Sequence, residues 1–180
     1  MGFPATISKW DMFALAGKEK PAGVDLSGNL DFLGEHGPAV GAEFDYDRPD
    51  MNGELEGYVV VQDDGDDEIS GRNAIDHDGD TRGYVKGQHR QYLNDGWELS
   101  AELAFVSDET FLEEFFRSEA ESAKPYETSL YLKKQERDWA VTLLTRYDLN
   151  DFTAQTTTLQ APGYSVDKLP EAGYWRIGTG

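Results

Sequence analysis

Apolar and polar side chains alternate, residue by residue, along the stretch Trp97-Glu98-Leu99-Ser100-Ala101-Glu102-Leu103-Ala104-Phe105. Successive residues of a β-strand point to opposite faces, so this stretch predicts a strand with one apolar face and one wet face. The same pattern returns in residues 24–32 and 40–46. A sheet of such strands must bury its apolar face against a partner layer or expose it to lipid.

The composition limits the classes of protein to consider. The 180 residues include 35 acidic and 16 basic side chains, for a formal charge of −19. This balance argues against nucleic acid or an anionic membrane surface as partner, because both require a basic face. The chain has no cysteine, which excludes disulfides and thiolate metal sites. No apolar run approaches the ~20 residues that a spanning helix needs.

The alternation predicts an all-β fold, an antiparallel up-and-down meander of about nine strands. The strands are expected at 7–15, 24–32, 39–47, 54–62, 82–92, 97–106, 127–135, 139–147 and 152–160, with a partial tenth near 169–177. Most approach the ~9–11 residues with which a tilted strand crosses a bilayer. Residues 1–180 are therefore predicted to form part of a large transmembrane β-barrel, and both ends look truncated.

The connections between the predicted strands differ in length at the two ends of the sheet. Two are long: an acidic loop at 63–80, and residues 107–126, where we expect a short helix at 109–117 with Ser107 or Asp108 as its N-cap. Both follow even-numbered strands, so they emerge at one end, while short turns are expected at the other. This arrangement is typical of outer-membrane barrels.

The barrel interpretation assigns side chains to lipid and to the membrane interface. The residues predicted to face lipid are Leu26, Leu30, Phe32, Val40, Phe44, Leu99, Leu103 and Phe105. Trp97 and Trp139 each open a strand directly after a short turn, where an aromatic girdle would meet lipid headgroups. Aromatic residues also begin strands because they suit strands, and the sequence leaves both interpretations open.

The acidic loop contains a partial calcium motif. Asp76-His77-Asp78-Gly79-Asp80 resembles the start of an EF-hand loop, but the required Gly and Glu at positions six and twelve are Thr81 and Gly87. We therefore expect a solvated acidic loop at 63–80, with loose divalent-cation binding as the alternative.

The sequence carries no recognisable catalytic or cofactor motif. The histidines, His36, His77 and His89, lack metal-ligand spacing. No nucleophile elbow and no phosphate-binding glycine loop occurs. We predict that the protein is not an enzyme, with no catalytic residue, cofactor or metal site.

Basic side chains form one stripe in this acidic protein. Arg82, Lys86 and Arg90 alternate with other residues of the fifth predicted strand, together with Tyr84 and Gln88. The favoured interpretation is charge pairing with acidic neighbours on the wet face. The alternative is contact with a phosphorylated ligand in the lumen.

Four apolar residues of the second long connection, Phe111, Leu112, Phe115 and Phe116, have helical spacing. They predict a loop helix that packs on the rim of the sheet or into the mouth of the barrel. Direct contact with lipid is the alternative.

Residues 97–108 end in Val106-Ser107-Asp108 and are followed by the aromatic-acidic segment Phe111-Leu112-Glu113-Glu114-Phe115-Phe116. In these residues the middle of the chain resembles the LptD family of lipopolysaccharide-assembly proteins. Further segments match in the same order along the chain: Gly37 to Tyr46, Arg82 to Leu93, Glu127 to Asp151 and Leu169-Pro170-Glu171.

The resemblance implies a very large barrel in the Gram-negative outer membrane, which passes lipopolysaccharide to the outer leaflet through a lateral opening. The implied partners are lipopolysaccharide, outer-membrane lipid, a plug lipoprotein and periplasmic bridge proteins. The chain departs from the family in lacking a signal peptide, a periplasmic domain and enough strands to close the barrel. The sequence leaves open whether this chain functions alone.

Two other functions remain as alternatives at this point. One is another outer-membrane barrel, such as a porin-like channel. The other is a soluble β-sandwich or carbohydrate-binding module, in which two apolar faces pack on each other.

Overall fold

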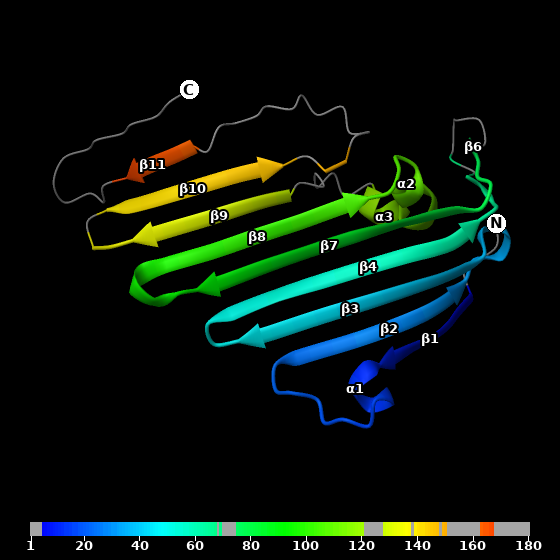
Figure 1. The fold of residues 1–180 in the computed structure, drawn as a ribbon, viewed down its shortest axis with the longest axis horizontal. Helices are drawn as coiled ribbons and strands as arrows, with labels where there is room; N and C mark the ends of the chain where they lie inside the picture. Colours follow the sequence, from blue (N-terminus) through cyan, green and yellow to red (C-terminus); the bar gives the residue numbers. More distant parts are fainter. Residues whose placement is uncertain are drawn as a thin grey trace.

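The computed structural model describes residues 5–67, 69, 75–120, 128–137, 139–147, 149–150 and 163–167. Residues 5–8, 118–119 and 163–167 are described by their backbone alone. Nine strands form one antiparallel sheet in the order β1-β2-β3-β4-β7-β8-β9-β10-β11, so each pairs only with its neighbours along the meander (Figure 1). The predicted all-β meander is confirmed.

The strands of the sheet are β1 (Ala5–Asp11), β2 (Val24–Phe32), β3 (Pro38–Arg48), β4 (Met51–Asp63), β7 (Asp80–Tyr92), β8 (Trp97–Val106), β9 (Thr128–Gln135), β10 (Ala140–Tyr147) and β11 (Gly163–Asp167). A separate small hairpin, β5 (Asp66–Asp67) and β6 (Ile75–Asp76), lies in the connection between β4 and β7. The helices are α1 (Met12–Leu15), α2 (Phe111–Phe115) and α3 (Arg117–Ala120), with short 3-10 turns η1 (Gly34–His36) and η2 (Asn94–Gly96).

Most of the predicted strands are confirmed, and two, at 24–32 and 97–106, coincide with β2 and β8. The first predicted strand is wrong beyond Asp11, because the Asp11 carboxylate accepts hydrogen bonds from the N–H groups of Phe13 and Ala14 and caps α1. The connection to β2 is correspondingly longer than expected. The strands predicted at 152–160 and 169–177 lie outside the described residues.

The strand registers define the two faces of the sheet, because directly paired residues of antiparallel strands point to the same side. One row runs across five strands, through Leu26, Phe44, Leu55, Gly87 and Leu103. The apolar face contains this row together with Val24, Leu30, Phe32, Val40, Val59, Val85, Trp97, Leu99, Phe105, Leu130, Leu132 and Leu143. All the residues predicted to share one face therefore do so.

The opposite side, here called the polar face, has a different composition. Its residues include Asp25, Ser27, Asn29, Asp31, Glu43, Asp45, Glu54, Glu56, Tyr58, Arg82, Tyr84, Lys86, Gln88, Arg90, Glu98 and Glu102. Acidic side chains predominate over β2, β3 and β4, whereas β7 carries the basic stripe. The period-two pattern of the sequence thus places most charged side chains of these strands on the polar face.

The buried core is small and lies on the polar face, at the end of the sheet that carries the two long connections, here called the long-loop end. Helix α2 packs there on Ala39, Tyr58, Val60, Tyr84 and Val106. The apolar face, in contrast, is open: Phe32 is 53% exposed, Leu103 40% and Phe105 45%. No second layer covers it in the described part of the chain, which is unlike a β-sandwich.

The predicted helix at 109–117 is present in a shorter and broken form. Helix α2 begins at Phe111, and its backbone leaves the helical region at Phe116, before α3 begins at Arg117. Thr110 occupies the N-cap position without a capping hydrogen bond from its side chain. Asp108 supplies that interaction instead, because its carboxylate accepts from the N–H groups of Thr110 and Phe111.

Candidate functional site

The basic stripe of β7 pairs with acidic side chains across the polar face, as predicted. Lys86 lies 3.1 Å from Glu56, its direct cross-strand neighbour on β4. Gln88 donates a 2.6 Å hydrogen bond to Glu54, again directly opposite. Charge pairing therefore accounts for this stripe without a ligand.

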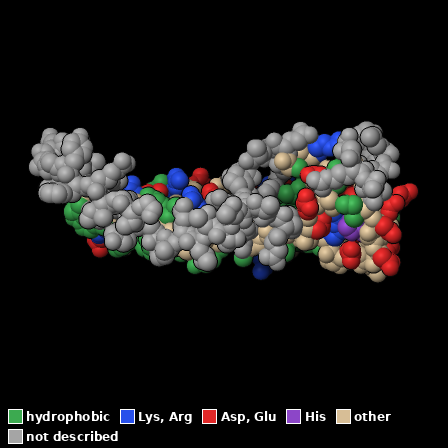
Figure 2. Space-filling model, turned by 90° about the horizontal axis from the view of Figure 1, so that it is seen from above, with side chains coloured by type: hydrophobic (Ala, Val, Ile, Leu, Met, Phe, Trp, Pro, Cys, Tyr) green, Lys and Arg blue, Asp and Glu red, His purple; other side chains and the backbone are tan. Residues whose placement is uncertain are grey.

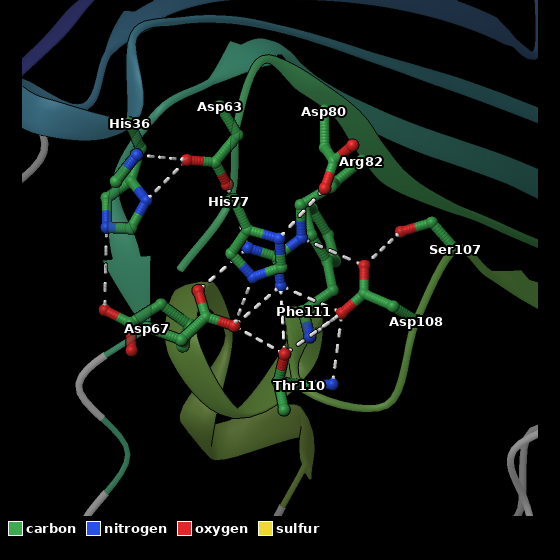
Figure 3. A network of polar contacts seen from close by, with 12 residues as sticks. His36, Asp63, Asp67, His77, Asp80, Arg82, Ser107, Asp108, Thr110 and Phe111 are labelled. Carbon is green, nitrogen blue, oxygen red and sulfur yellow. Dashed lines mark hydrogen bonds and ion pairs between the residues drawn. The ribbon is translucent and has the colours of Figure 1, made fainter. Parts of the chain in front are cut away.

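Arg82, at the start of β7, is the centre of the most heavily bonded cluster of the described residues (Figure 3). Its guanidinium donates to Asp63 at 2.8 Å, to both carboxylate oxygens of Asp67 at 2.8 Å, and to Asp108 at 2.8 and 3.0 Å. It also donates to the Thr110 hydroxyl at 3.1 Å. The planar fork of five N–H donors suits arginine to this role, because a lysine ammonium has only three.

The cluster corrects the expectation of a solvated acidic loop at 63–80. Asp63 and Asp67 are completely buried, and Arg82 is only 3% exposed. A carboxylate leaves water only when it is paired and hydrogen-bonded, and the guanidinium provides both interactions. Asp64, Asp66, Asp76, Asp78 and Asp80 remain exposed, and Figure 2 shows the acidic side chains gathered at this end of the molecule.

Two histidines extend the cluster on either side of Arg82. His36 Nδ1 lies 2.8 Å from Asp63, and the His36 ring meets the Phe115 ring edge-on with centroids 4.8 Å apart. His77 lies between Asp67 and Asp80, with one ring nitrogen 3.2 Å from each carboxylate. The fold thus brings together two histidines that are far apart in the sequence.

The third histidine, His89, lies elsewhere. It is on the apolar face, where its ring nitrogen Nδ1 hydrogen-bonds the hydroxyl of Tyr46. The two residues belong to non-adjacent strands and meet over Gly53, which has no side chain to separate them.

The cluster shifts the acidity of its members. Burial raises the pKa of Asp108, but hydrogen bonds from Arg82 and Ser107 outweigh it and hold that pKa well below its usual range. The pKa of Asp67 is lowered in the same way, with burial opposed by Arg82 and Thr110. Burial lowers the pKa of His77, but its bonds to Asp80 and Asp67 prevail and raise it overall.

The donor set includes one arrangement with metal-ligand geometry. His36, Asp63 and Asp67 each place a ligand atom within 4.8 Å of the other two. However, both carboxylates already accept hydrogen bonds from Arg82. We therefore interpret this arrangement as part of the ion-pair cluster. The sequence missed it because His36 comes from the turn before β3, whereas Asp63 and Asp67 come from the end of β4 and the connection after it.

The predicted girdle residues lie at the other end of the sheet, here called the short-turn end (Figure 1). Trp97 is the first residue of β8, and Trp139 directly precedes β10. Both are partly exposed, and the Lys134 ammonium lies 5.5 Å from the centre of the Trp97 ring. A cation over an aromatic face is an attractive contact.

Comparison with known proteins adds one decisive finding. A family model described as "LPS transport system D" matches residues 80–174, a little over half of the chain. The chain belongs to the LptD family. The matched segment begins at the first residue of β7, so it contains Arg82 and Asp108 of the cluster as well as β8, β9, β10 and β11.

The LptD family transports and assembles lipopolysaccharide at the outer membrane and is not a family of enzymes. A comparison with curated proteins found no match to this chain. Among the described residues, no helix has both the length and the apolar character needed to cross a membrane.

Proposed function

We propose that this LptD-family chain forms one section of the wall of an outer-membrane β-barrel that inserts lipopolysaccharide into the outer leaflet. The observation that supports the proposal best is the open apolar face, which lies opposite a charge-paired polar face in a single antiparallel layer. In water such a face would drive aggregation. In a barrel wall the apolar face meets lipid and the polar face lines the lumen.

The height of the apolar face suits a bilayer. In β8 the alternate residues from Trp97 to Phe105 all belong to it. These eight steps span about 27 Å along the strand at ~3.4 Å per residue. A tilt of ~40° reduces this to about 20 Å, close to the ~25 Å apolar band of outer-membrane barrels.

The proposal assigns roles to the residues singled out in the sequence. Lipid contact is made by Leu26, Leu30, Phe32, Val40, Phe44, Leu99, Leu103 and Phe105, and Trp97 and Trp139 belong to an interfacial girdle. The plug lipoprotein and the periplasmic bridge proteins are the partners that the family suggests. Their contacts are expected outside the apolar face, which lipid occupies.

The proposal also requires further strands. In the described residues β1 and β11 each have one strand neighbour, so the sheet has two open edges. Bilayer hydrocarbon cannot satisfy the unpaired N–H and C=O groups of an edge. We therefore infer that residues 1–180 are a part of the barrel domain and that additional strands pair with both edges.

The test compares arginine substitutions at two adjacent residues of β8 that lie on opposite faces of the sheet. In the complete protein in bilayers, Leu103→Arg places a charge on the apolar face, which costs ~2–4 kcal/mol near the bilayer midplane. Glu102→Arg introduces the same side chain on the polar face and should lower the free energy of unfolding much less. Heat-modifiable gel mobility and denaturant titration report both. Equal damage from the two variants would contradict the assignment of lipid and lumen faces.

A further inference from the structure

Three connections that are distant in the sequence meet over the polar face at the long-loop end. They contribute residues 34–36 from the turn before β3, residues 64–67 after β4, and residues 107–116 after β8. These three segments are called the lid below. They are joined to one another by side chains as well as to the strands beneath them.

Arg82 fastens the lid from below. Its guanidinium reaches Asp67 in the second segment and Asp108 and Thr110 in the third. Thr110 also donates directly to Asp67, so the second and third segments touch each other. His36 connects the first segment to Asp63 and to the Phe115 ring.

The lid covers an apolar patch on the otherwise polar face. The Phe116 ring meets the rings of Tyr58 and Tyr84 edge-on, with centroids 5.1 and 5.0 Å apart. Val60, below them, is completely buried, as is Phe111 of the lid. Removal of the lid would expose this patch without breaking a strand pairing of the sheet.

The lid has little stability of its own. Helix α2 has 5 residues and α3 has 4, far below the ~12–15 residues at which an isolated helix becomes even marginally stable. The strands beneath it are held by long ladders of backbone hydrogen bonds, with one register shift between Val60 and Asp63 of β4. Segments of low intrinsic stability on a stable framework open locally rather than with the whole molecule.

Because of the buried charges, the closed position of the lid depends on one side chain, that of Arg82. Asp63 and Asp67 are completely buried, and Arg82 is the guanidinium that both share. Removing one partner of a buried ion pair leaves an uncompensated charge, which is strongly destabilising. Without Arg82 the Asp67 carboxylate must therefore move to water, and the lid segment that carries it must move as well.

We propose that the three segments form a single lid over the polar face, latched by Arg82, which opens and closes as one unit. Arg82 is a positioning residue: it acts by holding Asp67, Asp108 and Thr110 in place. The lid goes beyond the proposed function and does not depend on it, because it rests on contacts within the chain.

Hydrogen exchange followed by mass spectrometry on the full chain tests the latch, with Arg82→Met compared with Arg90→Met. Arg90 lies on the same strand and face, but its ion pair with Glu98 is long, at 3.6 Å, and exposed. We expect Arg82→Met to speed exchange about tenfold or more in residues 34–36, 64–67 and 107–116 together. Exchange in β2 and β3 should stay unchanged, and Arg90→Met should resemble the parent.

Three outcomes would overturn the proposal. Faster exchange in one lid segment alone would show that the segments move separately. Faster exchange throughout β2 and β3 would show that Arg82 holds the whole sheet. Similar effects from Arg90→Met would show that the loss of any positive charge on this strand is enough to open the lid.

A disulfide between two lid segments provides the second arm. Asp67 and Thr110 are in direct side-chain contact, and the chain has no native cysteine to compete. In the Arg82→Met background, Asp67→Cys with Thr110→Cys still leaves Asp63 and Asp108 without their guanidinium partner. Exchange in both segments should therefore be fast when the cysteines are reduced and slow when they are oxidised. If the oxidised form stays as exposed as the reduced form, Arg82 does not act as a latch between these segments.

Discussion

Asn150 completes the backbone hydrogen bonding of Val106, which belongs to the strand β8. The Asn150 side-chain carbonyl accepts a 2.9 Å bond from the Val106 N–H, and its amide donates to the Ala104 carbonyl at 3.3 Å. The pairing of β8 with β9 ends at Glu102 and Ser129. Beyond that point side chains replace the missing part of a strand, because the Thr128 hydroxyl accepts from the Ala104 N–H and Asn150 bonds Val106 and Ala104.

Replacing this side chain should destabilise the sheet. Asn150→Ala leaves a buried N–H and a buried C=O without that partner, at a cost of ~1–3 kcal/mol for each unsatisfied group. Denaturant titration of the complete protein in detergent or bilayers measures the change in unfolding free energy. Asn52→Ala, at an exposed position of the polar face, is the matched control. Equal effects of the two variants would refute the role of Asn150.

The lid should be most stable over a limited pH range. Asp67 and Asp108 have pKa values lowered from 3.8, so their stabilisation is present above that value and is lost as the pH falls through the lower folded pKa. His77 has a pKa raised from 6.5, so its stabilisation is complete below 6.5 and is lost as the pH rises through the raised value.

Lid opening is measured by hydrogen exchange at a series of pH values. Each exchange rate is corrected for the intrinsic exchange rate at that pH. His77→Gln cannot titrate, so it should abolish the loss that His77 contributes above pH 6.5. The acid limb should remain, because Arg82 and Thr110 still lower the pKa of Asp67, although the hydrogen bond from His77 also contributes to that lowering. An unaltered high-pH limb in this variant would assign the effect to another group.

The close packing of β4 against β7 predicts that valine substitutions at two positions of the apolar face will differ in their effect on stability. A Cβ atom at Gly87 would lie 2.9 Å from Leu55 Cδ1 and 3.0 Å from the Glu54 carbonyl oxygen, so Gly87→Val should cost ~1–3 kcal/mol by overpacking. Ala42→Val adds apolar volume at an exposed position of the same face and should cost little. Unfolding free energies in bilayers compare the two, and a harmless Gly87→Val would contradict the packing described for this row.

Residues 1–180 expressed alone should aggregate without detergent. The apolar face is exposed and the sheet has two open edges in the described part of the chain, both of which promote association. Size-exclusion chromatography with light scattering reports the state. A monodisperse monomer with a cooperative thermal transition in plain buffer would favour the soluble sandwich instead.

The sequence predicts the sheet well and the lid poorly, for a physical reason. The apolar face follows from the period of two along each strand, and residues such as Leu26 and Leu103 reveal their side without knowledge of any partner. The burial of Asp67 depends on Arg82 and Thr110, which reach it from other segments. Nothing local distinguishes this aspartate from the exposed Asp66 beside it, so the expectation of a solvated loop was wrong there.

The ends of helices are likewise predicted only in part from the sequence. The apolar spacing of residues 111–116 indicates a helix, but the backbone leaves the helical region at Phe116, whose ring contacts Tyr58 and Tyr84 on the strands β4 and β7. At Asp11 the information is local, because an aspartate two and three residues before free N–H groups is a recognisable cap.

The meander has a consequence for the order of assembly. Every strand joins a neighbour that has already been synthesised, so each pairing closes only a short loop and carries a small entropic cost. The sheet can therefore grow hairpin by hairpin from its β1 edge. The contacts of Arg82 are different, because they require segments on both sides of β7 and become complete only after β8 has been laid down. The contacts of Arg82 are thus complete only when six consecutive strands of the sheet, β1 to β4, β7 and β8, are in place.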